Sequence, residues 1–165
     1  MYLKIEKVNY SNKKESRILE SVLENWFKNP KDLCFIDPNI KYPFKFKKWV
    51  KLIDNIDKRN DIKTFCIKEN NWMIGMGNIL IDENSETAQI MHIFVDEEYR
   101  RKGVAMKMVE YLEKLAKSQN ISTIDLLIMP KNDPAKILFK KMGFKEMKIE
   151  GRKTMDTMKF RKELH

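Results

Sequence analysis

In the first half of the chain, apolar residues recur either at every second position, as in a strand, or at helical spacing. Residues 2–8 alternate as in a half-buried strand, and Ser11 is placed to cap a helix that ends near residues 29–30. A loop with three prolines follows, and apolar residues at helical spacing predict a second helix around 45–58. Three strand-like segments with turn-forming residues between them come next, at about 62–68, 72–81 and 86–95. These segments predict an antiparallel meander.

The second half of the chain predicts helices alternating with strands. The predicted order is a helix at 103–118, a strand at 122–129, a helix at 134–142, and strands at 144–150 and 153–161. The segment 122–129 is apolar and β-branched, which is typical of a strand covered on both faces. The strands that flank the first of these helices should therefore be parallel neighbours joined by a right-handed crossover. The pattern predicts an α/β fold.

Length and composition favour one globular domain spanning residues 1–165. No apolar run approaches the ~20 residues of a membrane helix, and the first residues alternate instead of forming a signal peptide. We therefore expect a cytoplasmic protein without membrane contact. Cys34 and Cys66 lie far apart and lack CxxC or Cys/His spacing. A zinc site is not expected, and nor is a disulfide, although the sequence leaves a Cys34–Cys66 bridge open.

The net charge of +9 raises the question of a nucleic-acid partner. Only six of the 33 basic residues are arginine, and the lysines are scattered over the whole chain. Such a distribution is typical of solvated faces, so no nucleic-acid partner is expected, and a basic nucleic-acid-binding protein is kept as an alternative. A positive surface would also help to capture a polyanionic cofactor.

The segment from Val95 to Ala105 is a candidate anion-binding site. An apolar strand runs into a basic turn with Gly103, and the turn opens a long amphipathic helix. The first N–H groups of a helix have no intrahelical partner and lie at the positive end of its dipole, so they bind phosphate well. Gly103 lets a ligand approach the backbone closely because it has no Cβ. Open α/β sheets bind ligands beyond the carboxyl ends of parallel strands, where this segment lies.

A second constellation covers residues 132–144. Pro134 disfavours a helical Asp133, so we expect Asp133 to cap a short helix and to leave the Asn132 side chain to bond elsewhere. Apolar residues at helical spacing follow, and Gly143 is placed to end the helix in the left-handed conformation.

Together these two segments resemble the GNAT superfamily of N-acetyltransferases. The family signature of Gln or Arg, two residues, Gly, one residue, then Gly or Ala fits the run from Arg100 to Ala105, and residues 132–144 fit the second family pattern. The resemblance implies a mixed, twisted sheet of about seven strands flanked by helices. It implies acetyl-CoA as cofactor and transfer of the acetyl group to a primary amine. The cofactor-binding residues would be Phe94, Val95, Arg100, Arg101, Lys102, Gly103, Val104, Ala105, Asn132 and Phe139.

The residues for proton transfer depart from the family pattern. Many members have a tyrosine at the position of Phe139, and some have a glutamate base at the position of Gln89. We therefore take His92 as the candidate catalytic base, because a histidine has an ordinary pKa near 6.5 and this strand should border the thioester. A buried histidine satisfied by a neighbour is the alternative, and Tyr99 and Tyr111 are alternative hydroxyl groups. A catalytically silent acyl-CoA binding module also fits these departures.

Two further features bear on the acyl acceptor. The apolar alternation breaks between residues 90 and 93, which indicates a β-bulge that would aim a backbone N–H of residues 93–95 at the thioester oxygen. Asp32 and Asp37 could bind a cationic amine, and Tyr42 and Phe44 could line the acceptor site, whereas Trp49 is assigned to the core. Small amines, amino acids, protein N-termini and lysine side chains all remain possible acceptors, and the protein could be a monomer or a homodimer.

Overall fold

The structure, a computed structural model, describes residues 2–57, 61–148 and 157–165. The first half contains β1 (Leu3–Lys7), α1 (Lys13–Trp26), α2 (Pro30–Ile36), α3 (Phe46–Asp57), β2 (Asp61–Glu69), β3 (Trp72–Asp82) and β4 (Thr87–Val95). The second half contains the 3₁₀ turn η1 (Glu97–Tyr99), α4 (Val104–Ser118), β5 (Thr123–Ile128), α5 (Asp133–Lys141), β6 (Lys145–Met147) and β7 (Met158–Glu163).

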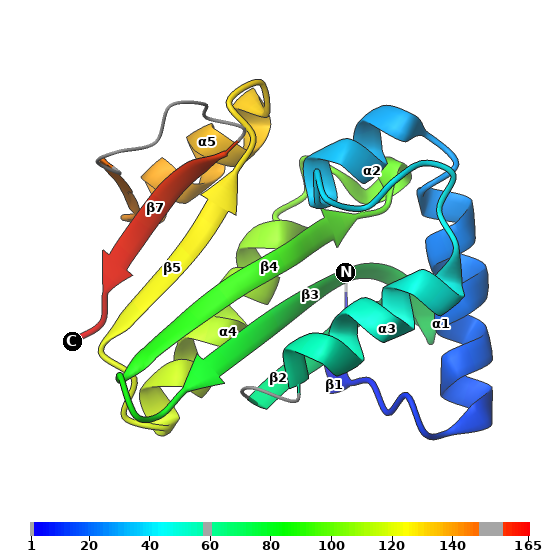
Figure 1. Cartoon of the computed structure of the whole chain (residues 1–165), viewed down its shortest axis with the longest axis horizontal. Helices are drawn as coiled ribbons and strands as arrows, with labels where there is room; N and C mark the ends of the chain where they lie inside the picture. Colours follow the sequence, from blue (N-terminus) through cyan, green and yellow to red (C-terminus); the bar gives the residue numbers. More distant parts are fainter. Residues whose placement is uncertain (1, 58–60, 149–156) are drawn as a thin grey trace.

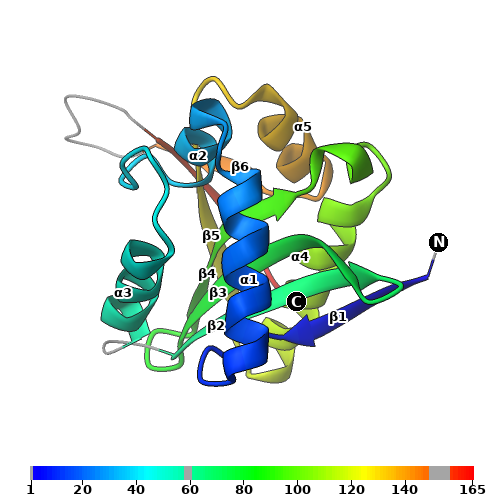
Figure 2. The same cartoon turned by 90° about the vertical axis from the view of Figure 1, so that its right-hand side faces the viewer.

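The strands form one sheet of seven in the order β1-β2-β3-β4-β5-β7-β6. The β2–β3–β4 meander is antiparallel and β4 pairs with β5 in parallel, so both topological predictions are confirmed. One apolar cluster packs α4 and α5 against one face of the sheet, and a second cluster packs α1, α2 and α3 against the other (Figures 1 and 2). The α/β fold with helices on both faces is therefore confirmed.

The β4 and β5 strands separate toward their carboxyl ends. They are paired only from Thr87 to Gln89 and from Thr123 to Asp125, although both strands continue beyond this point. Figure 1 shows the two arrowheads diverging in front of α4. The sheet is therefore open between two parallel neighbours, at the edge where α/β sheets bind their ligands.

A bulge in β4 confirms the break in alternation seen in the sequence. Met91 pairs with Asn78 and Phe94 with Met76, so β4 has one residue more than β3 between these two pairs. His92 lies within this stretch and adopts a left-handed conformation with φ of 57°. A bulge of this kind re-aims side chains and backbone groups locally.

Gly75, the β3 partner of Val95, is a site where the β3–β4 contact leaves no room for a side chain. A Cβ on Gly75 would lie 2.8 Å from Cγ2 of the buried Ile67 and 3.0 Å from the Phe94 carbonyl oxygen. We expect Gly75→Ala to lower the free energy of unfolding by about 2 kcal/mol. Denaturant unfolding measures this loss. Gly103→Ala, whose new Cβ meets no atom within 4 Å but whose φ of 78° strains an alanine, separates the cost of backbone strain from the cost of crowding. An unchanged or higher stability of Gly75→Ala would contradict the close packing.

The largest error in the sequence prediction is α2, because the loop with three prolines contains a helix. Asn29 caps this helix by accepting from the backbone N–H groups of Lys31 and Asp32, and Pro30 occupies its first turn. Proline is well accommodated there because the first turn has no intrahelical acceptor for its missing N–H. The Asn-Pro pair was therefore a helix start, and reading the prolines only as breakers was wrong.

Two caps lie one residue from their predicted positions. Asn12 rather than Ser11 caps α1, since its side chain accepts from the Glu15 N–H at 3.1 Å. Asn132 rather than Asp133 caps α5. The structure places β6 at Lys145–Met147 and β7 at Met158–Glu163, and residues 149–156 of the last two predicted strands lie outside the described part of the chain.

Candidate active site

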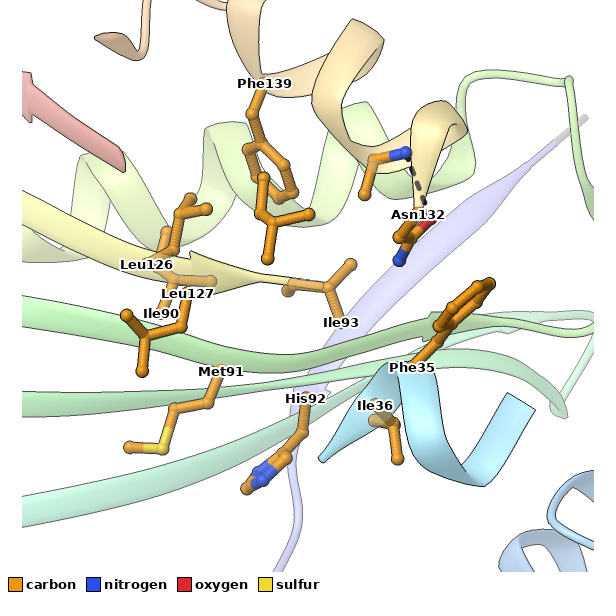
Figure 3. A pocket seen from close by; sticks show the side chains of 12 residues that line it. Phe35, Ile36, Ile90, Met91, His92, Ile93, Leu126, Leu127, Asn132 and Phe139 are labelled. Atoms are coloured by element: carbon orange, nitrogen blue, oxygen red, sulfur yellow. Dashed lines mark hydrogen bonds between the residues drawn. The ribbon is translucent and has the colours of Figure 1, made fainter. Parts of the chain in front are cut away.

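An open pocket lies where β4 and β5 separate. Its volume is about 390 Å³ including the solvent at its mouth, and residues of α2, β4, β5 and α5 line it. Three residues singled out from the sequence, His92, Asn132 and Phe139, are brought together here. In Figure 3, Phe139 and Ile93 point into the space between the strands, whereas His92 turns to the opposite side of β4. The pocket thus lies between the β4 bulge and the second sequence constellation, residues 132–144.

Phe139 and Asn132 both have structural partners in this pocket. Phe139 is buried and lies edge-on to Phe144 with the ring centroids 5.4 Å apart. The Asn132 side-chain oxygen accepts from the Ala135 N–H at 3.3 Å (Figure 3). The expectation that Asn132 is released from capping is therefore wrong, because Asn132 is itself the N-cap and fixes the start of α5.

The turn from Arg100 to Gly103 forms a backbone cradle at the end of β4. Arg101 and Gly103 both have positive φ, 64° and 78°, and Gly103 is the N-cap of α4 without a side-chain capping bond. A Cβ built on Gly103 would meet no atom within 4 Å. Left-handed residues at a helix start turn successive N–H groups toward one concave surface, which binds anions. The residues present therefore fit a pyrophosphate.

The Arg100 side chain turns back from this cradle toward β4 and α2. Its Nε donates to the Val95 carbonyl at 3.0 Å, its guanidinium lies 5.1 Å from the centroid of the Phe94 ring, and Nη2 lies 3.6 Å from Asp32 Oδ2. Arg100 therefore braces the turn in this structure. The Lys102 ammonium lies over the Tyr99 ring at 5.5 Å.

His92 is buried and hydrogen-bonded through both ring nitrogens. Nε2 lies 2.9 Å from Asp37 Oδ2, and Nδ1 lies 2.8 Å from the side-chain nitrogen of Asn78. The ring of Trp49 packs against the imidazole at 4.8 Å between centroids. Only 5% of His92 is exposed, and its Nε2 faces the Asp37 carboxylate, whose side chain is 16% exposed.

Asp37 ends α2 and remains a carboxylate at neutral pH. Burial alone would raise the pKa of its carboxyl group, but the hydrogen bond from His92, the hydrogen bonds from Asn39 and the charge of His92 together lower this pKa below its ordinary value. Asn39 donates its backbone N–H to Asp37 Oδ1 at 2.9 Å. The two loop acids of the sequence analysis thus differ: Asp32 binds Arg100, and Asp37 binds the candidate base.

The other candidates have structural roles. Phe44 packs against Phe27 and Trp49 in the core, and neither Phe44 nor the exposed Tyr42 lines the described pocket. Trp49 is buried, as predicted. Tyr111 packs edge-on against Phe65 at 5.2 Å, so it belongs to the α4 face of the sheet.

Asn78 is the residue that sequence reasoning missed. It is fully buried in β3 and binds both His92 and Thr64. The signal for it was one amide side chain within an otherwise apolar strand, where an unpaired polar group is unfavourable. Such a residue needs a buried partner, and the β4 bulge supplies one.

Three findings concern other kinds of site. Cys34 and Cys66 are free thiols, the first exposed and the second buried. Among the described residues, no group of His, Cys, Asp and Glu side chains could hold a metal ion. No helix in the same part of the chain has the length and apolar character needed to cross a bilayer.

Comparisons with known proteins agree with this geometry. Residues 15–144 match the model of the acetyltransferase (GNAT) family. An uncharacterized N-acetyltransferase of Methanocaldococcus jannaschii is 27% identical over 118 residues, which cover 66% of this chain. The chain spans about half the length of that relative, with 51% covered.

Solved structures share the whole fold at low sequence identity. A GNAT-family acetyltransferase of Staphylococcus aureus is 19% identical with a TM-score of 0.75, and the alignment covers 99% of this chain and 100% of that one. The spermidine N-acetyltransferase of Vibrio cholerae, solved with CoA and spermine, is 18% identical with a TM-score of 0.73, covering 98% of this chain and 95% of that one. Because the family model matches most of its length and solved members share its fold, the chain belongs to the GNAT acetyltransferase family.

Proposed function

We propose that this protein transfers the acetyl group of acetyl-CoA, the donor used by its family, to a primary amine. The observation that carries the proposal is the alignment of two features along β4. The strand leaves its parallel neighbour at Gln89, and the anion cradle at Arg100–Gly103 follows the end of the strand at Val95 after the η1 turn. A ligand with a diphosphate at one end and a slender arm at the other fits between them.

Different residues of the chain would hold the two parts of the cofactor. Backbone N–H groups from Arg101 to Ala105 would bind the pyrophosphate, with the charges of Arg100 and Lys102 nearby. Phe94, Val95 and Asn132 would hold the pantetheine arm between the strands, beside Phe139. The bound cofactor supplies a thioester, whose carbonyl is open to attack by an amine.

The bulge in β4 supports an assignment of the groups that would act on the reacting atoms. We assign the backbone N–H groups of residues 93–95 as donors to the thioester oxygen, because donors aimed at a developing negative charge stabilise the transition state. The neutral amine nitrogen would form a bond to the acetyl carbon while the carbon–sulfur bond breaks. Phe139 has no hydroxyl group, so the proton that the nitrogen loses would reach the departing thiolate through water.

We propose that the Asp37–His92 pair receives the acceptor amine. A primary amine arrives as an ammonium ion, and the ionised Asp37 carboxylate is a suitable counter-ion for it. His92, 2.9 Å behind Asp37, is the proposed proton acceptor. This arrangement favours an enzyme over a silent CoA-binding module, since a module needs no buried acid–base pair.

Release of the free CoA thiol tests the function directly. Purified protein is incubated with acetyl-CoA and a panel of alkylamines, amino acids, peptides with free N-termini and lysine peptides, and thiol release is followed. Release that depends on both acetyl-CoA and amine supports the proposal. CoA binding without release on any acceptor would leave the binding module as the function, and absence of CoA binding would contradict both.

We also place the activity in the cytoplasm, in a monomer or homodimer that needs no nucleic acid. Its basic residues are scattered along the sequence, which does not favour a DNA-binding groove. DNA binding that falls steeply with salt and is unaffected by acetyl-CoA would contradict this assignment.

Asp37→Asn tests the counter-ion. The amide keeps the size of the side chain and can still accept from His92, but it carries no charge. We expect KM for an alkylamine to rise about tenfold, the size of one partly buried charge pair lost from binding. KM for aniline, which is neutral at assay pH, should change little. Glu20→Gln on the exposed face of α1 removes the same charge and is the control. Equal effects on both amines would contradict the role of Asp37.

A further inference from the structure

A chain of hydrogen bonds crosses the sheet behind His92. Trp49 Nε1 donates to Tyr10 Oη at 3.2 Å, and Tyr10 Oη lies 2.9 Å from Thr64 Oγ1. Thr64 donates to the side-chain oxygen of Asn78, and the Asn78 nitrogen lies 2.8 Å from His92 Nδ1. The chain therefore links α3, the β1–α1 loop, β2, β3 and the β4 bulge, and it ends at Asp37.

The donors and acceptors of this chain fix the tautomer of His92. The Asn78 oxygen is occupied by the Thr64 hydroxyl, so the amide presents its NH₂ group to the imidazole. An NH₂ group can only donate, so His92 Nδ1 must be the acceptor without a proton. Its Nε2 then carries the proton and donates it to Asp37 Oδ2. Each group from Trp49 to His92 therefore donates a hydrogen bond to the next group in the chain, and Asp37 is the final acceptor.

A turned amide would give the opposite tautomer. With the Asn78 oxygen facing the ring, Nδ1 must carry the proton, and Nε2 is left with a lone pair toward Asp37. Asn78 would then donate to Thr64, whose hydroxyl group would turn to Tyr10. A lone pair facing an ionised carboxylate is unfavourable, so this state needs a cation at Asp37. An ammonium group bound there would provide that charge and the proton that Nε2 accepts.

We infer that Asn78 is a positioning residue that selects the tautomer of His92, with the orientation of its amide deciding whether Nε2 donates to Asp37 or can accept a proton from the amine. The inference rests on the proposed function for its catalytic consequence. The resting tautomer itself follows from the geometry alone. The groups facing His92 are Asp37 from α2, Trp49 from α3 and Asn78 from β3, and Tyr10 is the next titratable group along the chain.

Nitrogen NMR of the imidazole groups tests the tautomer without any substrate. The chain has two histidines, and His165→Gln leaves the His92 signals alone in the spectrum. At neutral pH, long-range nitrogen–proton correlations should show His92 with the proton on Nε2. A mixture of tautomers, as in a free histidine, or a proton on Nδ1, would overturn the inference.

Asn78→Asp and Thr64→Val extend the test to Asn78 itself. A carboxylate at position 78 accepts from Nδ1–H in every orientation, so His92 should carry a proton on Nδ1 at neutral pH. Thr64→Val has nearly the same shape but removes the donor that holds the amide, so both tautomers should be populated. Asn84→Asp in the exposed β3–β4 turn adds the same charge as a control. An unchanged Nε2–H tautomer in both variants would overturn the inference even where one of them folds poorly.

Activity separates this inference from the proposed function. If the enzyme acetylates amines, the acid limb of its kcat/KM profile should shift in Thr64→Val while its affinity for CoA stays the same. If no amine is acetylated but the His92 spectrum is as expected, the proposed function fails and the selection of the tautomer by Asn78 stands. If an active Thr64→Val variant keeps the pH profile of the parent's kcat/KM, the proposed effect of the Asn78 amide on catalysis is overturned.

Discussion

Gly103→Glu is expected to weaken the binding of CoA at least about 100-fold, the size of a lost charge-assisted phosphate site. The open space around Gly103 is where the backbone cradle would face the pyrophosphate, and a glutamate there would occupy this space with a negative charge. Without ligand, the same carboxylate lies at the positive end of the α4 dipole, which is favourable. The left-handed conformation opposes it by roughly 1–2 kcal/mol. The fold should therefore survive the substitution.

Calorimetric titration with CoA and denaturant unfolding together check this expectation. Gly103→Asn is the matched control, because asparagine tolerates φ of 78° and carries no charge. We expect CoA affinity of the control within about tenfold of the parent. Unchanged affinity in Gly103→Glu would show that the cradle does not hold the cofactor. Loss of affinity together with loss of the folded state would contradict the assignment of Gly103 to binding alone.

The order of strands and helices could be predicted because the spacing of apolar residues differs between a helix and a strand. The apolar face of α4 and the apolar β5 segment predict a crossover between parallel strands. The broken alternation before Val95 predicts a bulge. What the sequence could not provide is the pairing of residues remote in sequence. His92 and Asp37 are 55 positions apart, and no local pattern joins them.

The proposed cofactor side of the site is visible in one contiguous stretch of sequence, whereas the proposed acceptor side is not. The cradle is a contiguous turn, so its glycine, its charges and the helix start lie within a few residues. The proposed acceptor side combines residues of α2, β3 and the bulge, and the sequence pattern predicts a loop where α2 lies. The sequence also does not decide whether Asn132 or Asp133 caps α5, because the choice between two neighbouring capping residues depends on their backbone angles.

The helix α2 joins the two halves of the site. Near its start Asp32 pairs with Arg100 of the cradle, and at its end Asp37 binds His92 of the bulge. Phe35 and Ile36 between them line the pocket. The same short helix thus contacts the cofactor turn and the candidate acid–base pair, so displacement of α2 would disturb both.

His92→Gln is expected to lower kcat/KM for an alkylamine about 100-fold near neutral pH, the lower range for loss of a general base. The glutamine amide can still donate to Asp37, so the counter-ion stays in place, but it cannot take up a proton at any working pH. The amine must then arrive already neutral. Because the neutral fraction of an alkylamine rises up to a pH of about 10, the deficit of the variant should shrink as pH rises.

The pH profile of kcat/KM for parent and variant is the measurement that decides the role of His92. A deficit that closes toward alkaline pH identifies His92 as the proton acceptor. A deficit of the same size at every pH would assign it a structural role, as expected for a buried histidine that only supports the bulge. Tyr111→Phe, which removes a hydroxyl group on the α4 face, should leave the profile unchanged. Tyr99→Phe tests the other candidate hydroxyl, and a loss there that closes with rising pH would move the assignment from His92 to Tyr99.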